Sequence, residues 1–340
     1  MNPLDWDQSP ERRALADVIA DILNADAGKV LHGLCEAGVP WIGISEDAGG
    51  SGGDLGDAAI AARTLAAHHL QSPVAENSFV AGWILELVGI PVPRSLVTVA
   101  FESGPAVRVE RTLDDWRLSG ELHLVPFAAQ SSAIAVLVDF DGLPGIALIA
   151  TSDTHLDETC NLGGDARCTV TFHDVAPQGF GFLPAGMSIP DCRARLALLR
   201  CIQIAGALRS IRDMTVRYAR ERVQFGKPLS AIQSIAQSLA RIAEQTLLIE
   251  AAVALALEEP STWNCAIAKT TAGQGAKDAT MLAHQVHGAM GISSEYPLGA
   301  MTTRIWSWLE EGGRSKDWAA YLGNRFLSQS SPTLWTTITH

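Results

Sequence analysis

The sequence predicts a mainly helical α+β fold with an N-terminal helical domain, a small middle domain of antiparallel strands and a C-terminal four-helix bundle. Two changes of pattern predict it. Apolar residues recur at helical spacing up to Pro91 and Pro93, and the period is that of strands beyond them. Three long helical patterns with short connections then follow Pro190, which is typical of a bundle. We expect the domains to cover residues 1–93, 94–184 and 185–340.

The N-terminal domain begins with a clear helix start, in which Ser9 is the cap and Pro10 follows in the first turn. Gly38 ends a second helix. The helices are expected at residues 9–25, 29–37, 54–70 and 76–88. The glycine-rich segment 41–53 lacks the Gly-Lys-Ser/Thr ending of a phosphate loop, so we interpret it as a flexible loop.

The middle domain is predicted from short runs rich in β-branched and aromatic residues. The Asp141-Gly142 pair is a hairpin turn signal between two of these runs. Strands are expected at residues 96–101, 107–109, 116–118, 133–140, 145–150 and 169–172. Short strands at this spacing indicate a small antiparallel sheet or barrel.

The bundle is predicted from apolar stripes at spacings of three and four. The first helix carries such a stripe from Leu196 to Tyr218 and is stopped by Pro228. The second begins at Ser230 and ends at Glu259-Pro260. The third, from Cys265 to about Met290, is rich in alanine and glycine and is suited to close packing.

Composition and charge exclude several classes of function. The formal net charge is −12, and no segment supplies the basic patch that nucleic acid requires. The six cysteines form neither a CxxC pair nor a cluster with metal-ligand spacing, which indicates a reduced, cytoplasmic protein without a metal. The acidic first residues do not fit a signal peptide, and no apolar stretch is long enough for a membrane span.

Two motifs in the last third of the chain resemble a known family. Tyr218-Ala-Arg-Glu-Arg222-Val-Gln-Phe225-Gly226-Lys-Pro228 is followed by Gln233, and Gln285-Val-His287-Gly288-Ala-Met-Gly291 is followed by Glu295-Tyr-Pro297. These stretches are similar to the two C-terminal signatures of acyl-CoA dehydrogenases. In that family the signatures contact the FAD held by the dimer partner. The resemblance therefore implies cofactor-binding roles for Arg222, Phe225, Gln233, Gln285, His287 and Gly288.

Residue chemistry agrees with these implied roles. Arg222 offers a permanent charge and several coplanar donors to a pyrophosphate. Phe225 can pack on a flat ring, and Gly288 lets backbone N–H groups approach a cofactor. Each residue also has a structural alternative. Arg222 would be a solvated helix-end cation and Phe225 a core residue, Gln233 would complete a capping box with Ser230, and His287 would be satisfied within the fold.

The chain departs from the family where each subunit holds its own flavin. A motif of the type T-E-P-x-x-G-S-D and a later tryptophan followed by threonine or serine are matched here by residues 100–105 and by Leu124-Val-Pro126. The hydroxyl that would bond the flavin near N5 and the shielding indole are both missing. Proline has no N–H, so it cannot replace that bond. The chain's own flavin half-site is therefore interpreted as damaged.

The family's reaction also needs a carboxylate that takes the α-proton of a CoA thioester. Members commonly carry it in a Y-E-G-T element, which only Glu311-Gly312 matches here, with a small shift. Glu311 is thus the candidate catalytic base, and its alternative is a solvated acid at a helix end. Other members place the base before the arginine motif, where this chain has Leu196 and no neighbouring acid.

Together these features suggest one subunit of a heteromeric acyl-CoA dehydrogenase, similar to the α2β2 enzymes of actinobacterial steroid side-chain degradation. A homologous subunit would supply the flavin sheet and the base, an acyl-CoA would be the substrate, and an electron-transfer flavoprotein would be the acceptor. Two alternatives stay open. One is a self-sufficient homotetrameric dehydrogenase that uses Glu311, and the other is a flavin-free assembly protein.

Overall fold

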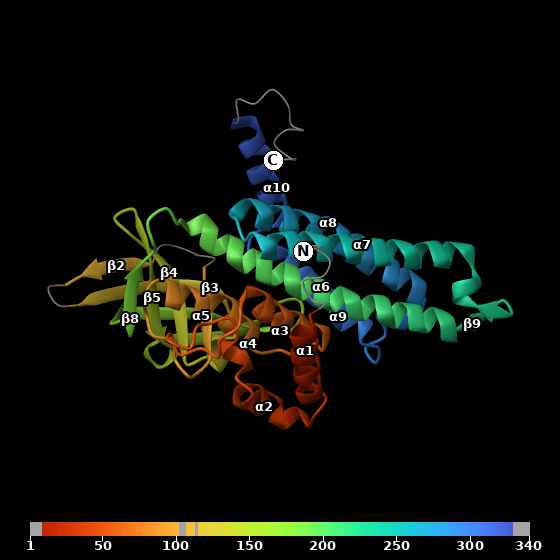
Figure 1. The fold of residues 1–340 in the computed structure, drawn as a ribbon, viewed down its shortest axis with the longest axis horizontal. Coiled ribbons are helices and arrows are strands. Elements are labelled where there is room, and N and C mark those ends of the chain that lie inside the picture. Colours follow the sequence, from red (N-terminus) through yellow and green to blue (C-terminus); the bar gives the residue numbers. More distant parts are fainter. Residues whose placement is uncertain (1–8, 102–106, 113–114, 329–340) are drawn as a thin grey trace.

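The computed structural model describes residues 9–101, 107–112 and 115–328. Figure 1 shows three parts side by side, with the strands at one end, the N-terminal helices below the middle, and long helices that reach the other end. This is the mainly helical α+β architecture that the sequence predicts. The domain boundaries themselves stay predictions.

The N-terminal helices start where the caps indicate. Ser9 caps α1 by accepting a hydrogen bond from the Arg12 N–H, and Asp54 and Asp57 form a capping box at the start of α3. Asn77 ties this part to the strands, since its amide donates to Pro40 O at 2.6 Å and accepts from Val97 N at 2.7 Å. The helices are α1 Pro10–Leu23, α2 Val30–Glu36, α3 Leu55–Ala67, α4 Val74–Glu76 and α5 Gly82–Leu87, and a π-helical turn over Asn77–Ala81 joins the last two.

The middle strands form two four-stranded sheets, with orders β1-β4-β5-β8 and β2-β3-β7-β6. Asp141 and Gly142 both have positive φ between β4 and β5, which confirms the predicted hairpin turn. One pair departs from the antiparallel prediction, because β1 pairs with β4 in parallel. The strands are β1 Val97–Ala100, β2 Arg108–Arg111, β3 Trp116–Pro126, β4 Ala133–Phe140, β5 Leu143–Ala150, β6 His155–Cys160, β7 Ala166–Val175 and β8 Gly179–Phe182.

The C-terminal part consists of three long helices, α6 Ile189–Glu221, α7 Gln233–Glu258 and α8 Thr262–His287, followed by α9 Leu298–Glu310 and α10 Ser315–Ser328. The stretch between α6 and α7 was expected to be the end of a helix. It is instead a hairpin of β9 Val223–Gln224 and β10 Lys227–Pro228, which projects at the far end of the molecule in Figure 1. Phe225 and Gly226 form its turn, both with positive φ.

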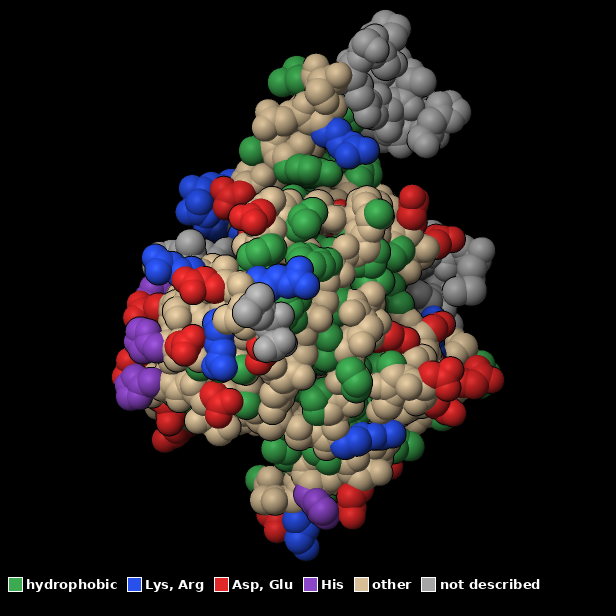
Figure 2. Space-filling view, turned by 90° about the vertical axis from the view of Figure 1, so that its left-hand side faces the viewer, with side chains coloured by type: hydrophobic (Ala, Val, Ile, Leu, Met, Phe, Trp, Pro, Cys, Tyr) green, Lys and Arg blue, Asp and Glu red, His purple; other side chains and the backbone are tan. Residues whose placement is uncertain are grey.

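The surface at the strand end carries mixed charge. Figure 2 shows Lys and Arg side chains distributed among acidic ones on this face, with apolar side chains between them. Among the described helices, none is long and apolar enough to cross a membrane.

Candidate functional site

The first candidate site lies at the far end of the bundle, where the two sequence motifs meet. The hairpin 222–228, Gln233 and residues 285–292 form what we call the bundle-end surface. Tyr218 on α6 stacks on His287 of α8 at a ring-centroid distance of 4.4 Å, and Leu229 and Val286 share one small apolar cluster beneath the surface. These contacts hold the hairpin next to the end of α8.

Arg222 and Gln233 both present free polar groups on this surface. Arg222 is the exposed C-cap of α6, and within the described chain its guanidinium has no hydrogen bond or ion pair. Gln233 is the exposed first residue of α7, and Ile232 is the N-cap, without a side-chain cap bond. The capping-box alternative is therefore wrong, because the Leu229–Ala231 turn delays the helix start past Ser230.

Phe225 stands at the hairpin tip with 89% of its surface exposed, so the core alternative is wrong. Its φ of 52° lies in the left-handed region, which costs a bulky residue about 1–2 kcal/mol. An exposed aromatic ring in a strained backbone position suits a surface that another molecule covers.

Replacing Phe225 with asparagine should separate stability from ligand binding. Asparagine tolerates positive φ, so we expect the isolated chain to be as stable or more stable, by up to about 1 kcal/mol. The loss of the ring should weaken flavin retention in any complex that this surface completes. Chemical denaturation and flavin dissociation measure the two effects, and unchanged flavin retention would exclude a contact by Phe225.

The second motif is divided between exposed and buried groups. Gln285 and Gly288 are exposed, whereas only 3% of His287 is. The His287 ring bonds Ala283 O at 2.8 Å and the Tyr296 hydroxyl at 3.1 Å, and burial lowers its pKa. The predicted cofactor contact by the His287 side chain is therefore corrected, because both ring nitrogens are already used inside the fold. His287 supports the turn instead.

Gly288 combines a φ of 58° with open space around it. A Cβ added there would have no atom within 4 Å, so the backbone conformation, not packing, requires glycine. The Gly288 N–H already bonds His284 O. Together with the exposed Arg222 and Phe225, this surface offers a dinucleotide cofactor a cation, a flat ring and a turn without a side chain.

The second candidate site surrounds Glu311, directly after α9. The Glu311 carboxylate contacts Arg167 Nη2 at 2.5 Å, Arg200 Nε at 2.9 Å and Asn161 Nδ2 at 3.1 Å. Arg200 also pairs with Glu76 at 2.7 Å, and both of these side chains are 1% exposed. Glu76, Asn161, Arg167, Arg200 and Glu311 form what we call the Glu311 cluster, in which all three parts of the fold meet.

The Glu311 cluster sets the pKa of Glu311 and therefore its strength as a base. Burial alone would raise the pKa of Glu311, but the charges of Arg200 and Arg167 outweigh it, and the pKa lies below its ordinary value. The carboxylate therefore stays ionised and is held in hydrogen bonds, which makes it a weak base. The solvated-acid alternative is wrong, because the side chain is only 18% exposed and doubly paired.

Two further charged residues hold this region in place. The ammonium of Lys269, which is fully buried, donates to Trp308 O and Glu311 O at 2.6 Å each and so fixes the turn after α9. Arg304 pairs with Asp165 at 2.8 Å. Sequence reasoning missed these residues and Arg200, although Arg200 lies four positions after Leu196, on the face predicted to be buried.

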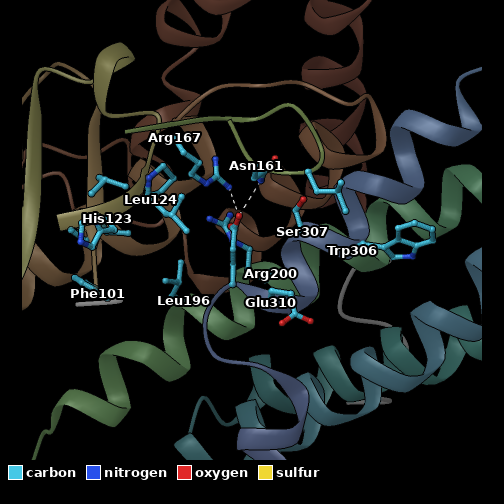
Figure 3. A pocket seen from close by; sticks show the side chains of 16 residues that line it. Phe101, His123, Leu124, Asn161, Arg167, Leu196, Arg200, Trp306, Ser307 and Glu310 are labelled. Atoms are coloured by element: carbon cyan, nitrogen blue, oxygen red, sulfur yellow. Dashed lines mark hydrogen bonds and ion pairs between the residues drawn. The ribbon is translucent and has the colours of Figure 1, made fainter. Parts of the chain in front are cut away.

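The chain's own flavin half-site does not fit a flavin where the structure describes it. Residues 102–105 of the motif lie outside the described residues. In the second element, Leu124 and Pro126 bring no side-chain donor, and both line a cavity with Val125, Arg167 and Arg200. The polar groups on the opposite wall of the cavity are paired with one another in the Glu311 cluster (Figure 3).

Comparisons with known proteins agree on one family. Residues 194–313 match the model of the acyl-CoA dehydrogenase C-terminal domain. The chain is 28% identical over 266 residues to acyl-CoA dehydrogenase IpdE2 of Mycobacterium tuberculosis, covering 78% of this chain and 76% of that protein. It is 26% identical over 320 residues to acyl-CoA dehydrogenase FadE28 of the same organism, covering 87% and 91%.

Solved structures show the same fold. The ChsE4-ChsE5 complex of Mycobacterium tuberculosis matches with a TM-score of 0.82 at 18% identity, covering 97% of this chain and 96% of that one. Butyryl-CoA dehydrogenase of Megasphaera elsdenii matches with a TM-score of 0.82 at 19% identity, covering 94% and 98%.

Acyl-CoA dehydrogenases are FAD-dependent oxidoreductases that act on CH–CH bonds. The C-terminal part of the chain, residues 194–313, belongs to this family.

Proposed function

We propose that this chain is the mainly non-catalytic subunit of a heteromeric acyl-CoA dehydrogenase, in which it completes the FAD site of a homologous, catalytic partner. One observation carries the proposal. Within the part of the chain that the structure describes, the Arg222 and Gln233 side chains are exposed and unpaired, whereas Glu311, the acid nearest the base position of the signature, is paired with two arginines.

In this proposal the bundle-end surface binds and orients. Arg222 supplies charge to the pyrophosphate, Phe225 covers a flat part of the cofactor, and Gln233, Gln285 and the Gly288 backbone contact its edge. A flavin bound at this surface would supply the hydride-accepting chemistry of the reaction. The partner supplies the base for the α-proton, because Glu311 stays paired in this chain.

The substrate and the acceptor are also part of the proposal. Relatives include a complex of two different chains, ChsE4-ChsE5, and a steroid acyl-CoA dehydrogenase pair, Tcur3481-Tcur3483. They support an assembly of two different chains, and we propose that it is an α2β2 enzyme of the cytoplasm that desaturates the CoA thioester of a steroid side chain, with an electron-transfer flavoprotein as acceptor.

The two alternatives make different demands. A self-sufficient homotetramer needs Glu311 free to take a proton, and the Arg167 and Arg200 pairs oppose that. A flavin-free assembly protein would leave Arg222 and Phe225 without a role.

Expression alone and with neighbouring dehydrogenase-like genes tests the proposal through visible spectra and native mass. The proposal predicts a nearly colourless chain alone and a yellow, active complex with a partner. Flavin absorbance and dye reduction by the chain alone would support the homotetramer, and the absence of FAD in every combination would support the assembly protein.

A further inference from the structure

We propose that the cavity beside the Glu311 cluster is a binding site of its own, which takes an uncharged apolar group and does not take a flavin. The cavity has a volume of about 340 Å³ and lies between β1, β3, the loop after β6, α6 and α9. Figure 3 shows its lining side chains converging from these elements. This inference goes beyond the proposed function, since it concerns a cavity within this chain and not the bundle-end surface that contacts the partner's cofactor.

One wall of the cavity is apolar and continuous. Val99, Phe101 and Val125 of the strand side and Leu196 of α6 are all at most 5% exposed. A group that fills this space removes apolar surface from water without the loss of a hydrogen bond, which favours a hydrocarbon ligand.

The rim of the cavity is apolar as well. Leu124 is 62% exposed, Leu162 is 68% exposed and Trp306 is 39% exposed, and all three line the cavity. Large apolar side chains that gather around an opening indicate a surface that a ligand covers.

Leu124 reaches the rim through a strained backbone. Its φ is 54°, within the irregularity of β3 pairing between Leu122 and Val125. A leucine in the left-handed region is uncommon, and bulges of this kind redirect side chains next to binding sites. The irregularity turns the Leu124 side chain outward, where 62% of it is exposed at the rim of the cavity and can contact a ligand.

The opposite wall is polar, and the charged groups of the Glu311 cluster that line it are paired with one another. Glu311 is held by Arg167, Arg200 and Asn161, and Ser307 accepts from Gly163 N at 2.9 Å and donates to Thr303 O at 3.1 Å. A charged ligand group would have to break these pairs. The edge of a flavin ring carries several polar atoms. In this cavity those atoms would find no hydrogen-bond partner, which costs about 1–3 kcal/mol for each.

The charged residues at the rim further limit the class of ligand that the cavity can bind. The carboxylate of Glu310 is exposed and lines the opening, and His123 pairs with Glu121 at 3.3 Å. An anionic group at the mouth would therefore meet another anion. The part of the ligand that enters is uncharged, and the part at the mouth is not acidic.

The test uses the full chain and 1-aminoanthracene, a neutral, flat three-ring fluorophore. We expect saturable binding of one probe per chain. Leu124→Asn should weaken binding about fivefold, since it removes part of a leucine contact. Asparagine suits the left-handed backbone at this position, so folding is preserved. Leu143→Asn is the matched control, because Leu143 is a similarly exposed leucine, 57% exposed, on β5 and outside the cavity lining.

Competition with lumiflavin, the ring system of a flavin without its phosphates, decides the ligand class. We expect lumiflavin to displace the probe only at concentrations well above the probe's own Kd. Displacement at or below that concentration would overturn the inference in favour of a flavin site. Equal probe affinity in both variants, or no saturable binding, would overturn it as well. Neither readout depends on flavin in the heteromeric complex, so this inference and the proposed function fail separately.

Discussion

The substitution Arg222→Ala is expected to lower the FAD affinity of the heteromeric complex by about 10- to 100-fold. A hydrogen bond to a charged group contributes about 1.5–3 kcal/mol, and Arg222 has no competing partner within the described chain. The measurement is the flavin content of the purified complex, followed by FAD titration of the apoprotein. Arg222→Lys should recover only part of the affinity, because lysine lacks the planar fork of donors.

The control for this experiment lies on the same helix. Arg220 is also exposed near the end of α6, and Arg220→Ala removes the same charge two residues away. We expect it to leave flavin content close to that of the unmodified complex. A complex that keeps all its FAD after Arg222→Ala would count heavily against a contact between Arg222 and the partner's FAD.

The substitution Glu311→Gln is expected to destabilise this chain by about 3–5 kcal/mol while the complex keeps its turnover per bound flavin. The loss follows because Arg167 would remain buried without its charge partner and Arg200 would keep only Glu76. Chemical denaturation measures the stability, and dye reduction by an acyl-CoA measures the turnover. A self-sufficient enzyme that uses Glu311 as its base would instead lose its turnover.

The pH dependence of this effect has a definite sign. Because the folded-state pKa of Glu311 is lowered, its stabilisation is complete above the unfolded-state value of about 4.3 and is lost as pH falls through the folded value. The stability gap between the unmodified chain and Glu311→Gln should be constant from about pH 8 to 5 and shrink below about pH 4. Glu310→Gln is the control, since Glu310 is exposed and should change stability by less than about 0.5 kcal/mol.

Local signals in the sequence predicted much of the fold. Ser9 at the start of α1 and Asp141-Gly142 between β4 and β5 act through their immediate neighbours, so their effects are readable from a few residues. The polar strand β6, His155–Cys160, was missed because most of its residues are exposed and give no apolar alternation. The parallel pairing of β1 with β4 depends on contacts across the fold that no local pattern encodes.

The two candidate sites also differ in how far the local sequence predicts them. The exposed Arg222 and Gly288 belong to short contiguous motifs, so the sequence identifies them. The Glu311 cluster brings together Glu76, Arg167 and Arg200 from distant segments, and sequence reasoning left Glu311 as a possible base or a solvated acid. Only the assembled fold shows that it is neither solvated nor free.

The number of FAD molecules in the complex shows whether this chain holds a flavin of its own. If this chain completes its partner's FAD site and cannot hold a flavin in its own damaged half-site, an α2β2 complex must contain two FAD molecules. Native mass spectrometry of the co-expressed complex, combined with the visible spectrum of the released flavin, gives that number. We expect two per heterotetramer, whereas four would mean that this chain holds a flavin of its own and that its half-site is intact.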